Sequence, residues 1–199
     1  MAVYLVFGLP RQGKTSYLAW SADRALRGKA LNIGYLWGRS VMGDFAPYKR
    51  VYSNFPLKGA YQLDFSKLGR EEFRDCLILI DEIMLLCDSR DWKNYSKPLR
   101  DFMALHGHYR CDIVAASQSY SDCDVRIRNL AEHLYYVKRC GLFACITPIQ
   151  KRWRIDETIQ DGYSLESPLS SRFIWLPRLW EKFDSFAAPE LPENTALPW

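Results

Sequence analysis

The sequence predicts an α/β protein whose central sheet is mostly parallel and is flanked by helices. Three short segments indicate this, because strands that are buried on both faces consist almost entirely of apolar residues. These segments are residues 2–7, 76–80 and 113–116. Glycine or polar residues follow each of them directly. Ligands of open α/β sheets bind outside the carboxyl ends of the strands, so these following residues are candidates for a functional site.

Length and composition favour a folded globular protein. The chain has 199 residues, enough for one domain, and it is 48% hydrophobic and 25% charged, which excludes a disordered, collagen-like or coiled-coil chain. No apolar run approaches the roughly 18 residues that span a bilayer. Residues 1–7 lack the basic start of a signal peptide. We therefore expect a cytoplasmic protein, or one that reaches a membrane only through a partner.

The cysteines predict neither a disulfide framework nor a common metal module. Six are present, without any CxxC pair and without a secretory signal before them. Two of them lie in or beside apolar runs, where a free thiol packs as a small hydrophobic group. A zinc site is the alternative, although its spacing matches no common zinc module. Its ligands would be His106, His108, Cys111 and Cys123.

Positive charge is concentrated in the first third of the chain. The net formal charge is +4, but residues 1–58 contain nine Lys and Arg against two acidic residues. Such a segment can face the phosphates of a nucleotide or a polynucleotide, and a solvated basic surface is the alternative. Aromatic and basic residues also occur together there, as they do in grooves that bind a single strand, unless the aromatic side chains belong to the core and the cations face solvent. They are Tyr35, Trp37, Tyr48, Lys49 and Arg50.

A phosphate-binding loop follows the first apolar run. Residues 8–15 match GxxxxGK[ST], and a helical apolar pattern continues to about Gly28. Two glycines let backbone N–H groups converge on a phosphate, Lys14 can follow the β- and γ-phosphate oxygens, and the Thr15 hydroxyl can ligate Mg²⁺. We therefore expect ATP and Mg²⁺ as cofactors. The expected nucleotide contacts are Gly8, Leu9, Pro10, Arg11, Gln12, Gly13, Lys14, Thr15 and Ser16.

Two adjacent carboxylates follow the second apolar run. Asp81 is placed to join Thr15 in holding Mg²⁺, and Glu82 is placed to polarise the attacking water as a general base. The alternative is an acidic pair that only stabilises the start of the next segment. An amide follows the third run, and Gln118 can contact both the water and the γ-phosphate, or it can simply cap the strand end. Lys14, Glu82 and Gln118 are therefore the expected catalytic residues.

A ring ATPase often receives an arginine from the neighbouring subunit, which stabilises charge in the transition state. Several arginines are candidates for such an arginine finger, and the sequence favours none of them over the others. They are Arg90, Arg100, Arg110, Arg126 and Arg128.

The remaining segments predict further elements. Residues 31–37 and 51–55 have the composition of strands, and apolar residues at helical spacing predict a helix before residue 106, with Pro98 as a break or in the first turn. Two apolar segments around Cys140 and Gly141 predict a hairpin. In residues 151–154 basic side chains stand on both sides of a tryptophan, an alternation typical of an edge strand with one solvent-exposed face. This segment is also a second candidate for a basic contact with nucleic acid.

The C-terminal part contains prolines that favour an extended arm around the domain or a neighbour. Several large aromatic side chains there need a covering surface, for which a subunit interface is the expectation; they are Trp175, Trp180, Phe183 and Phe186. We expect an ATPase core over residues 1–138 and a C-terminal hairpin and extended arm over residues 139–199.

Residues 3–138 resemble the cytoplasmic ATPase domain of the zonular occludens toxin family, the filamentous-phage assembly proteins. The matching pieces are the loop at 8–15, residues 51–54, 79–82 and 112–118, an Arg90-containing loop, the pair His106 and His108, and the series Asp124, Arg126 and Arg128. The family looks like a branch of the FtsK–HerA superfamily of DNA-translocating ATPases. The resemblance implies an additional-strand P-loop NTPase fold, with the strand before Gln118 between the phosphate-loop strand and the Asp81 strand.

The resemblance also implies a function. A ring-forming homo-oligomer would hydrolyse ATP to drive viral DNA, single- or double-stranded, during phage extrusion or genome packaging. Phage members of the family continue into a transmembrane helix and a periplasmic domain, and this sequence shows neither, so a capsid or membrane-anchoring partner protein is expected. The location would be the host cytoplasm or the virion.

Three other classes of protein share a phosphate-binding loop of this kind. A small-molecule or nucleotide kinase could use the same loop, but a water-activating Glu82 and Gln118 argue against phosphate transfer to another acceptor. A GTP switch would need an NKxD motif, and the chain has none. A module that binds nucleotide without turnover would not need Glu82.

Overall fold

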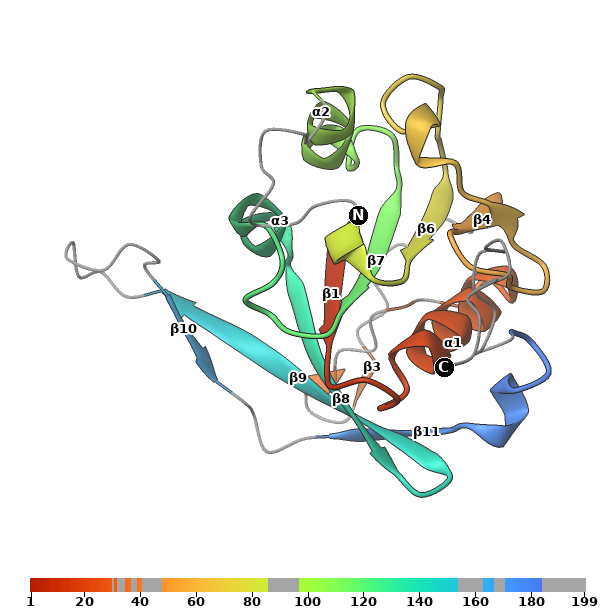
Figure 1. Cartoon of the computed structure of the whole chain (residues 1–199), viewed down its shortest axis with the longest axis vertical. Coiled ribbons are helices and arrows are strands. Elements are labelled where there is room, and N and C mark those ends of the chain that lie inside the picture. The colour runs from red at the N-terminus through yellow and green to blue at the C-terminus, as the bar shows by residue number, and fades with distance from the viewer. Residues whose placement is uncertain are drawn as a thin grey trace, which may run out of the picture.

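A single mixed sheet organises the molecule (Figure 1). The computed structural model describes residues 1–29, 31, 35–36, 39–40, 48–85, 97–153, 163–166 and 171–183. Within them the strand order of the sheet is β10-β9-β8-β1-β7-β6-β4-β5, and β11 also pairs with β9. The strand bounds are β1 Val3–Phe7, β4 Arg50–Ser53, β5 Tyr61–Gln62, β6 Cys76–Ile80, β7 Asp112–Ser117, β8 His133–Cys140, β9 Phe143–Trp153, β10 Tyr163–Glu166 and β11 Arg172–Trp175.

Short helices and a second small ladder complete the described elements. The ladder pairs β2 (Tyr35–Leu36) with β3 (Arg39–Ser40). The helices are α1 Lys14–Leu26, α2 Lys97–Leu105 and α3 Val125–Leu130, with 3-10 turns η1 Phe65–Lys67, η2 Ile83–Leu85 and η3 Pro177–Leu179. No helix in the described part of the chain is both long enough and apolar enough to cross a membrane.

The predicted order of the central strands is confirmed. Strands β1, β7, β6 and β4 run parallel, and β7 lies between β1 and β6. Phe7 pairs with Ser117, and Ile80 pairs with Ala115. The carboxyl ends of β1, β6 and β7 therefore meet at one edge of the sheet, as expected for a P-loop NTPase of the additional-strand type.

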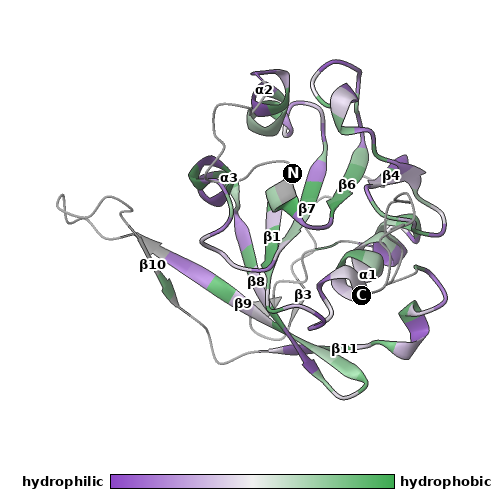
Figure 2. Ribbon diagram, viewed as in Figure 1, coloured by the Kyte–Doolittle hydropathy of each residue, from purple (hydrophilic) through white to green (hydrophobic). Residues whose placement is uncertain are grey.

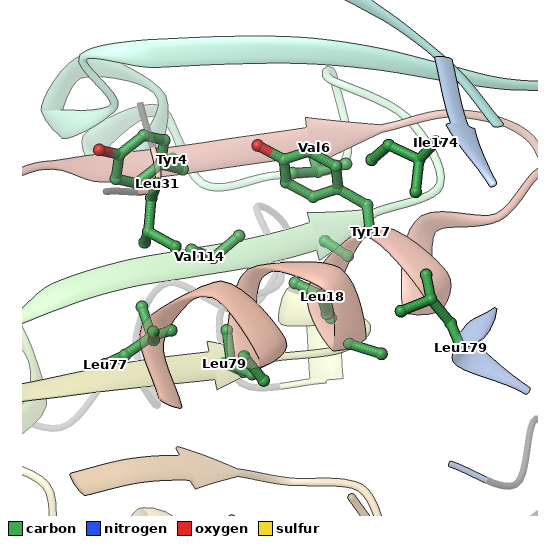
Figure 3. Packing of buried hydrophobic residues seen from close by; sticks show 14 of the residues in the cluster. Tyr4, Val6, Tyr17, Leu18, Leu31, Leu77, Leu79, Val114, Ile174 and Leu179 are labelled. Atoms are coloured by element: carbon green, nitrogen blue, oxygen red, sulfur yellow. The ribbon is translucent and has the colours of Figure 1, made fainter. Parts of the chain in front are cut away.

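Alternation along the strands divides the core into two layers. Tyr4 and Val6 face the side that α1 covers, whereas Val3 and Leu5 face the side covered by α2 and α3. Figure 3 shows Tyr17 and Leu18 of α1 against this first face. Figure 2 shows that β1 and β6 are mostly hydrophobic and that β7 is hydrophobic after a hydrophilic start, which agrees with burial of these strands on both faces.

The expected helix around Pro98 is confirmed, and Pro98 lies in its first turn, where its missing N–H costs no hydrogen bond. Helix α2 buries Leu99, Phe102 and Met103 against the sheet. Strands were also predicted over residues 31–37 and 51–55. Within the first, Tyr35 and Leu36 form β2, and in place of the second, β4 ends at Ser53 and excludes residues 54–55. Arg90, like residues 32–34 and 37, lies outside the described residues.

The predicted hairpin is confirmed, because β8 and β9 pair antiparallel up to Cys140 and Phe143. Strand β9 pairs with β8 over residues 143–149 and with β11 over residues 143–146. Residues 151–153 pair with β10 alone, with Leu165 as the cross-strand neighbour of Lys151, so this part of β9 lies at an edge, as predicted. The boundary expected between residues 138 and 139 falls inside β8.

Lys151 and Tyr48, two of the candidate nucleic-acid contacts, make hydrogen bonds within the protein. The Lys151 Nζ donates hydrogen bonds to the carbonyl oxygens of Arg128 and Ala131 at the end of α3, and burial lowers the pKa of this amine. The Tyr48 hydroxyl donates to the buried Asp112 carboxylate, and burial raises the pKa of Tyr48. The aromatic ring of Tyr48 thus belongs to the core, as the alternative interpretation had it.

The described C-terminal residues contact α1 and the segment after β4. Leu57 bridges to Phe183, and the Lys58 N–H donates to the Lys182 carbonyl. The Lys182 ammonium also pairs with Asp23 of α1, which Arg27 contacts as well. Burial disfavours the Asp23 carboxylate, but these cations outweigh it and hold the pKa of Asp23 below its ordinary value of 3.8.

Candidate active site

The phosphate-binding loop connects β1 to α1 at the sheet edge where the strands end. Gly13 precedes α1 with φ 96°, a left-handed conformation that favours glycine, and no side chain caps the helix. The N–H groups at the start of α1 are thus left for an anion at this loop. Lys14 is only 6% exposed, and its ammonium donates to the carbonyl oxygens of Gly8 (2.9 Å) and Leu9 (3.2 Å).

The loop is packed against β8. A Cβ atom on Gly8 would lie 2.4 Å from the Val137 carbonyl oxygen, so only glycine fits there without displacing a strand. The Arg139 N–H donates a 2.8 Å hydrogen bond to Oε1 of Gln12. This hydrogen bond to the side-chain oxygen of Gln12 ties the loop to β8 and leaves the Gln12 backbone at the loop.

A hydrogen bond joins the loop to the end of β6. The Thr15 hydroxyl donates to Oδ2 of Asp81 at 2.6 Å, although the two residues are 66 positions apart in the chain. A threonine hydroxyl and a carboxylate are oxygen ligands of the kind that Mg²⁺ prefers. The donor set beside the Lys14 ammonium therefore fits Mg²⁺ and a polyphosphate, as the sequence predicted.

Glu82 lies next to this pair in an unusual backbone conformation. Its φ is 51°, its N–H donates to Oδ1 of Asp81 at 3.1 Å, and its Oε2 is buried without a hydrogen-bond partner. Nε2 of Gln118 lies 3.5 Å from Oε1 of Glu82, a long contact of a kind that can tighten when substrate is present. A buried carboxylate oxygen without a partner has a free site for the proton of a water molecule.

The structure thus brings together the catalytic and metal-binding residues expected from the sequence. Lys14 and Thr15 come from the start of α1, Asp81 and Glu82 from the end of β6, and Gln118 from the end of β7. Because these three segments are distant in the chain, their proximity depends on the register of β1, β7 and β6.

The candidate arginines do not share one location. Arg110 precedes β7, at the opposite end of the strand from Gln118, and its guanidinium pairs with the buried Asp75 at 2.7 Å. Arg100 pairs with its neighbour Asp101 on α2. Neither geometry directs the side chain toward the phosphate-binding loop of its own subunit.

The other two described arginines lie on α3. Asp124 caps this helix by accepting from the Arg126 N–H at 2.8 Å, and the Arg126 side chain is exposed. The Arg128 guanidinium lies 5.3 Å from the centre of the Tyr120 ring, and that ring contacts Phe7, the residue before the loop. Arg128 thus lies nearer to the carboxyl end of β1 than Arg110 does.

The residues of the zinc alternative contact other groups. Nδ1 of His106 lies 2.8 Å from the Met103 carbonyl oxygen, and Sγ of Cys111 lies 3.3 Å from Sγ of Cys76. Across the described ranges, no cluster of three or more His, Cys, Asp or Glu side chains suits a metal ion.

One residue of the site had no role in the sequence analysis. Asn54 follows β4, and its side-chain amide binds both the N–H and the carbonyl oxygen of Asp81, at 2.7 and 2.8 Å. The available signal was an amide residue just after a strand that neighbours the Asp81 strand. Since parallel neighbours bring their carboxyl ends together, that position adjoins the site.

Comparison with known proteins agrees with this fold. The family model described as zonular occludens toxin (Zot) matches residues 2–165. No curated protein sequence matches the chain. Among solved structures, the N-terminal domain of zonular occludens toxin from Neisseria meningitidis is similar with a TM-score of 0.53 and 14% identity, over 92% of this chain and 98% of that one. The genome packaging NTPase B204 from Sulfolobus turreted icosahedral virus 2, in complex with ATP-gammaS, has a TM-score of 0.49 and 9% identity, over 70% and 75% of the two chains.

Proposed function

Because this chain belongs to the zonular occludens toxin family, we propose that it is an ATP-hydrolysing motor that drives viral DNA during virion assembly, by phage extrusion or genome packaging. The observation that supports hydrolysis most directly is the 2.6 Å hydrogen bond between Thr15 and Asp81. It joins the phosphate-binding loop to the strand end that holds Glu82. A loop that only bound nucleotide would need no general base beside it.

The proposed roles follow from the contacts of each side chain. On ATP binding, the Lys14 ammonium exchanges the carbonyl oxygens of Gly8 and Leu9 for the β- and γ-phosphate oxygens. Thr15 and Asp81 would hold Mg²⁺, which when bound supplies positive charge beside the phosphates. Oε2 of Glu82 accepts a proton from the attacking water, and the Gln118 amide orients that water against the γ-phosphate.

We propose that the motor acts as a ring-forming homo-oligomer, in the host cytoplasm or on the virion, with a capsid or membrane-anchoring partner. Exposed aromatic side chains support an interface between copies. Phe143 and Trp175 are cross-strand neighbours whose rings lie 4.9 Å apart, and Phe173 is 64% exposed beside them. In such a ring, Arg126 or Arg128 of one copy would reach the nucleotide of the next, and Arg90 is a further candidate.

Steady-state ATP hydrolysis, measured over a range of protein concentrations with and without DNA, tests the proposal. A motor with shared active sites should hydrolyse faster per subunit as concentration rises and should respond to DNA. Preference for single strands would favour extrusion, and preference for duplex would favour packaging. A rate that depends on neither concentration nor DNA would contradict the motor, and phosphate transfer to a nucleoside monophosphate would identify a kinase instead.

A further inference from the structure

The side chain of Asn54 extends the sheet by one residue at the active site. The backbone ladder between β4 and β6 ends where Ser53 pairs with Leu79. Beyond it, Oδ1 of Asn54 accepts from the Asp81 N–H at 2.7 Å, and Nδ2 donates to the Asp81 carbonyl oxygen at 2.8 Å. One amide therefore satisfies both backbone groups of the metal-binding residue, as a neighbouring peptide would in a continuous strand.

This clamp lies directly before a strained turn. Glu82 has φ 51°, a conformation that non-glycine residues rarely adopt and that persists only where the surroundings impose it. The Glu82 N–H folds back onto Oδ1 of Asp81, while Oε2 of Glu82 stays buried without a partner. If the Asp81 peptide could rotate, Glu82 could relax and its carboxylate would leave its place beside Gln118.

We propose that Asn54 is a positioning residue of this site, which holds the Asp81 peptide so that the Asp81 and Glu82 carboxylates face the phosphate-binding loop. The inference rests on the proposed hydrolysis, because only a reaction at Glu82 requires such placement. Asn54 itself touches neither phosphate nor water in this scheme. It acts through the backbone, so its effect belongs to the chemical step more than to nucleotide binding.

The first test separates turnover from binding. Asn54→Ala removes both hydrogen bonds and should lower kcat about 10- to 100-fold, the usual cost of losing a supporting hydrogen bond behind a functional ligand. The affinity for an ATP analogue should change less than about threefold, because the contacts of the loop and of Lys14 remain. A kcat within about twofold of wild type would overturn the inference.

Two further variants make this reading specific. Asn54→Asp keeps the volume but places a carboxylate oxygen against the Asp81 carbonyl oxygen, where two acceptors repel each other, so its kcat should fall at least as far as that of Asn54→Ala. Gln62→Ala is the matched control, since Gln62 is an exposed amide residue on β5 whose Cα partner is Ser53. Gln62→Ala should leave kcat unchanged. If Gln62→Ala lowered kcat as much as Asn54→Ala, the loss would come from a general weakening of this sheet edge, and the inference about Asn54 would fail.

A second readout does not need turnover. Amide hydrogen exchange followed by NMR should be at least about tenfold faster at Asp81 in Asn54→Ala, and unchanged there in Gln62→Ala. If the wild-type protein hydrolyses no ATP while this exchange increases, the proposed function fails and the clamp remains. If exchange at Asp81 stays at the wild-type rate, the inference about Asn54 fails whatever the activity.

Discussion

Gly8 lies so close to Val137 that a Cβ atom on the glycine would be 2.4 Å from the Val137 carbonyl oxygen. The first residue of the phosphate-binding loop is thus in contact with β8, the strand that leads into the hairpin. Together with the hydrogen bond from the Arg139 N–H to Gln12, this contact couples the loop to β8 and β9. A movement of the hairpin would therefore displace the phosphate-binding loop.

Gly8→Ala should destabilise the protein by about 1–3 kcal/mol, the usual cost of forcing an extra methyl group into a packed site. The loop should also be displaced, so affinity for an ATP analogue should fall. Thermal unfolding and nucleotide titration measure the two effects. Gly107→Ala is the control, because a Cβ atom there meets nothing within 4 Å. Equal melting temperatures for the two variants would contradict the close contact.

Lys14→Ala should abolish nucleotide binding and hydrolysis together. The variant loses the buried ammonium that the loop holds between the carbonyl oxygens of Gly8 and Leu9. Equilibrium binding of a fluorescent ATP analogue measures the loss. Lys29→Ala removes an exposed lysine just beyond α1 and should bind like wild type. If Lys14→Ala bound the ATP analogue with wild-type affinity, Lys14 would not contact the phosphates and the nucleotide would bind at another site.

Glu82→Gln should keep nucleotide affinity and stop turnover. The amide preserves the size of the side chain but cannot take a proton from water, so kcat should fall about 10²- to 10⁴-fold. Glu72→Gln, at an exposed carboxylate away from the site, should hydrolyse normally. Hydrolysis at the wild-type rate by Glu82→Gln would show that another group is the base.

The ion pairs of Asp23 should make stability depend on pH. The pKa of Asp23 in the folded protein lies below 3.8, since Lys182 and Arg27 outweigh the effect of burial. The carboxylate therefore stabilises the fold at neutral pH, and this contribution is lost as the pH falls below about 4 through the lowered pKa.

Asp23→Asn removes this contribution and tests it. Urea unfolding should show the variant to be less stable than wild type at pH 7, with the difference shrinking toward pH 3. A difference that stays constant over this range would mean that the charge of Asp23 does not stabilise the arm. Glu71→Gln, which removes an exposed carboxylate paired with Lys67, should shift stability little at any of these pH values.

Phe173→Ser should weaken self-association if the aromatic face of β9 and β11 is the interface between copies. Phe173 is 64% exposed and its ring lies 6.4 Å from that of Phe143. Sedimentation velocity over a concentration series should show a shift toward monomer. Leu105→Ser changes an exposed apolar residue on α2 and should associate like wild type. Unchanged association of Phe173→Ser would exclude this face.

The sequence predicted the parts of the site that depend on local signals. Continuous apolar runs predicted β1, β6 and β7, and the loop motif predicted the start of α1 at Lys14. Asp81, Glu82 and Gln118 were predicted to lie at one site because each directly follows or closely follows an apolar run, and parallel strands present their carboxyl ends at one edge of the sheet. The hairpin around Gly141 also follows from neighbouring residues alone.

Only the tertiary structure decided contacts between segments that are distant in the chain. The Lys151 ammonium donates to a carbonyl oxygen at the end of α3, and the Arg110 guanidinium pairs with Asp75, and neither contact follows from the residues around these side chains in the sequence. Asn54 is the clearest case, since its side-chain amide binds the backbone of Asp81, a residue 27 positions away in the chain. Residue type and spacing determine local conformation and chemistry, whereas the partner of a long polar side chain depends on strand order and register, which are set by packing of the whole sheet.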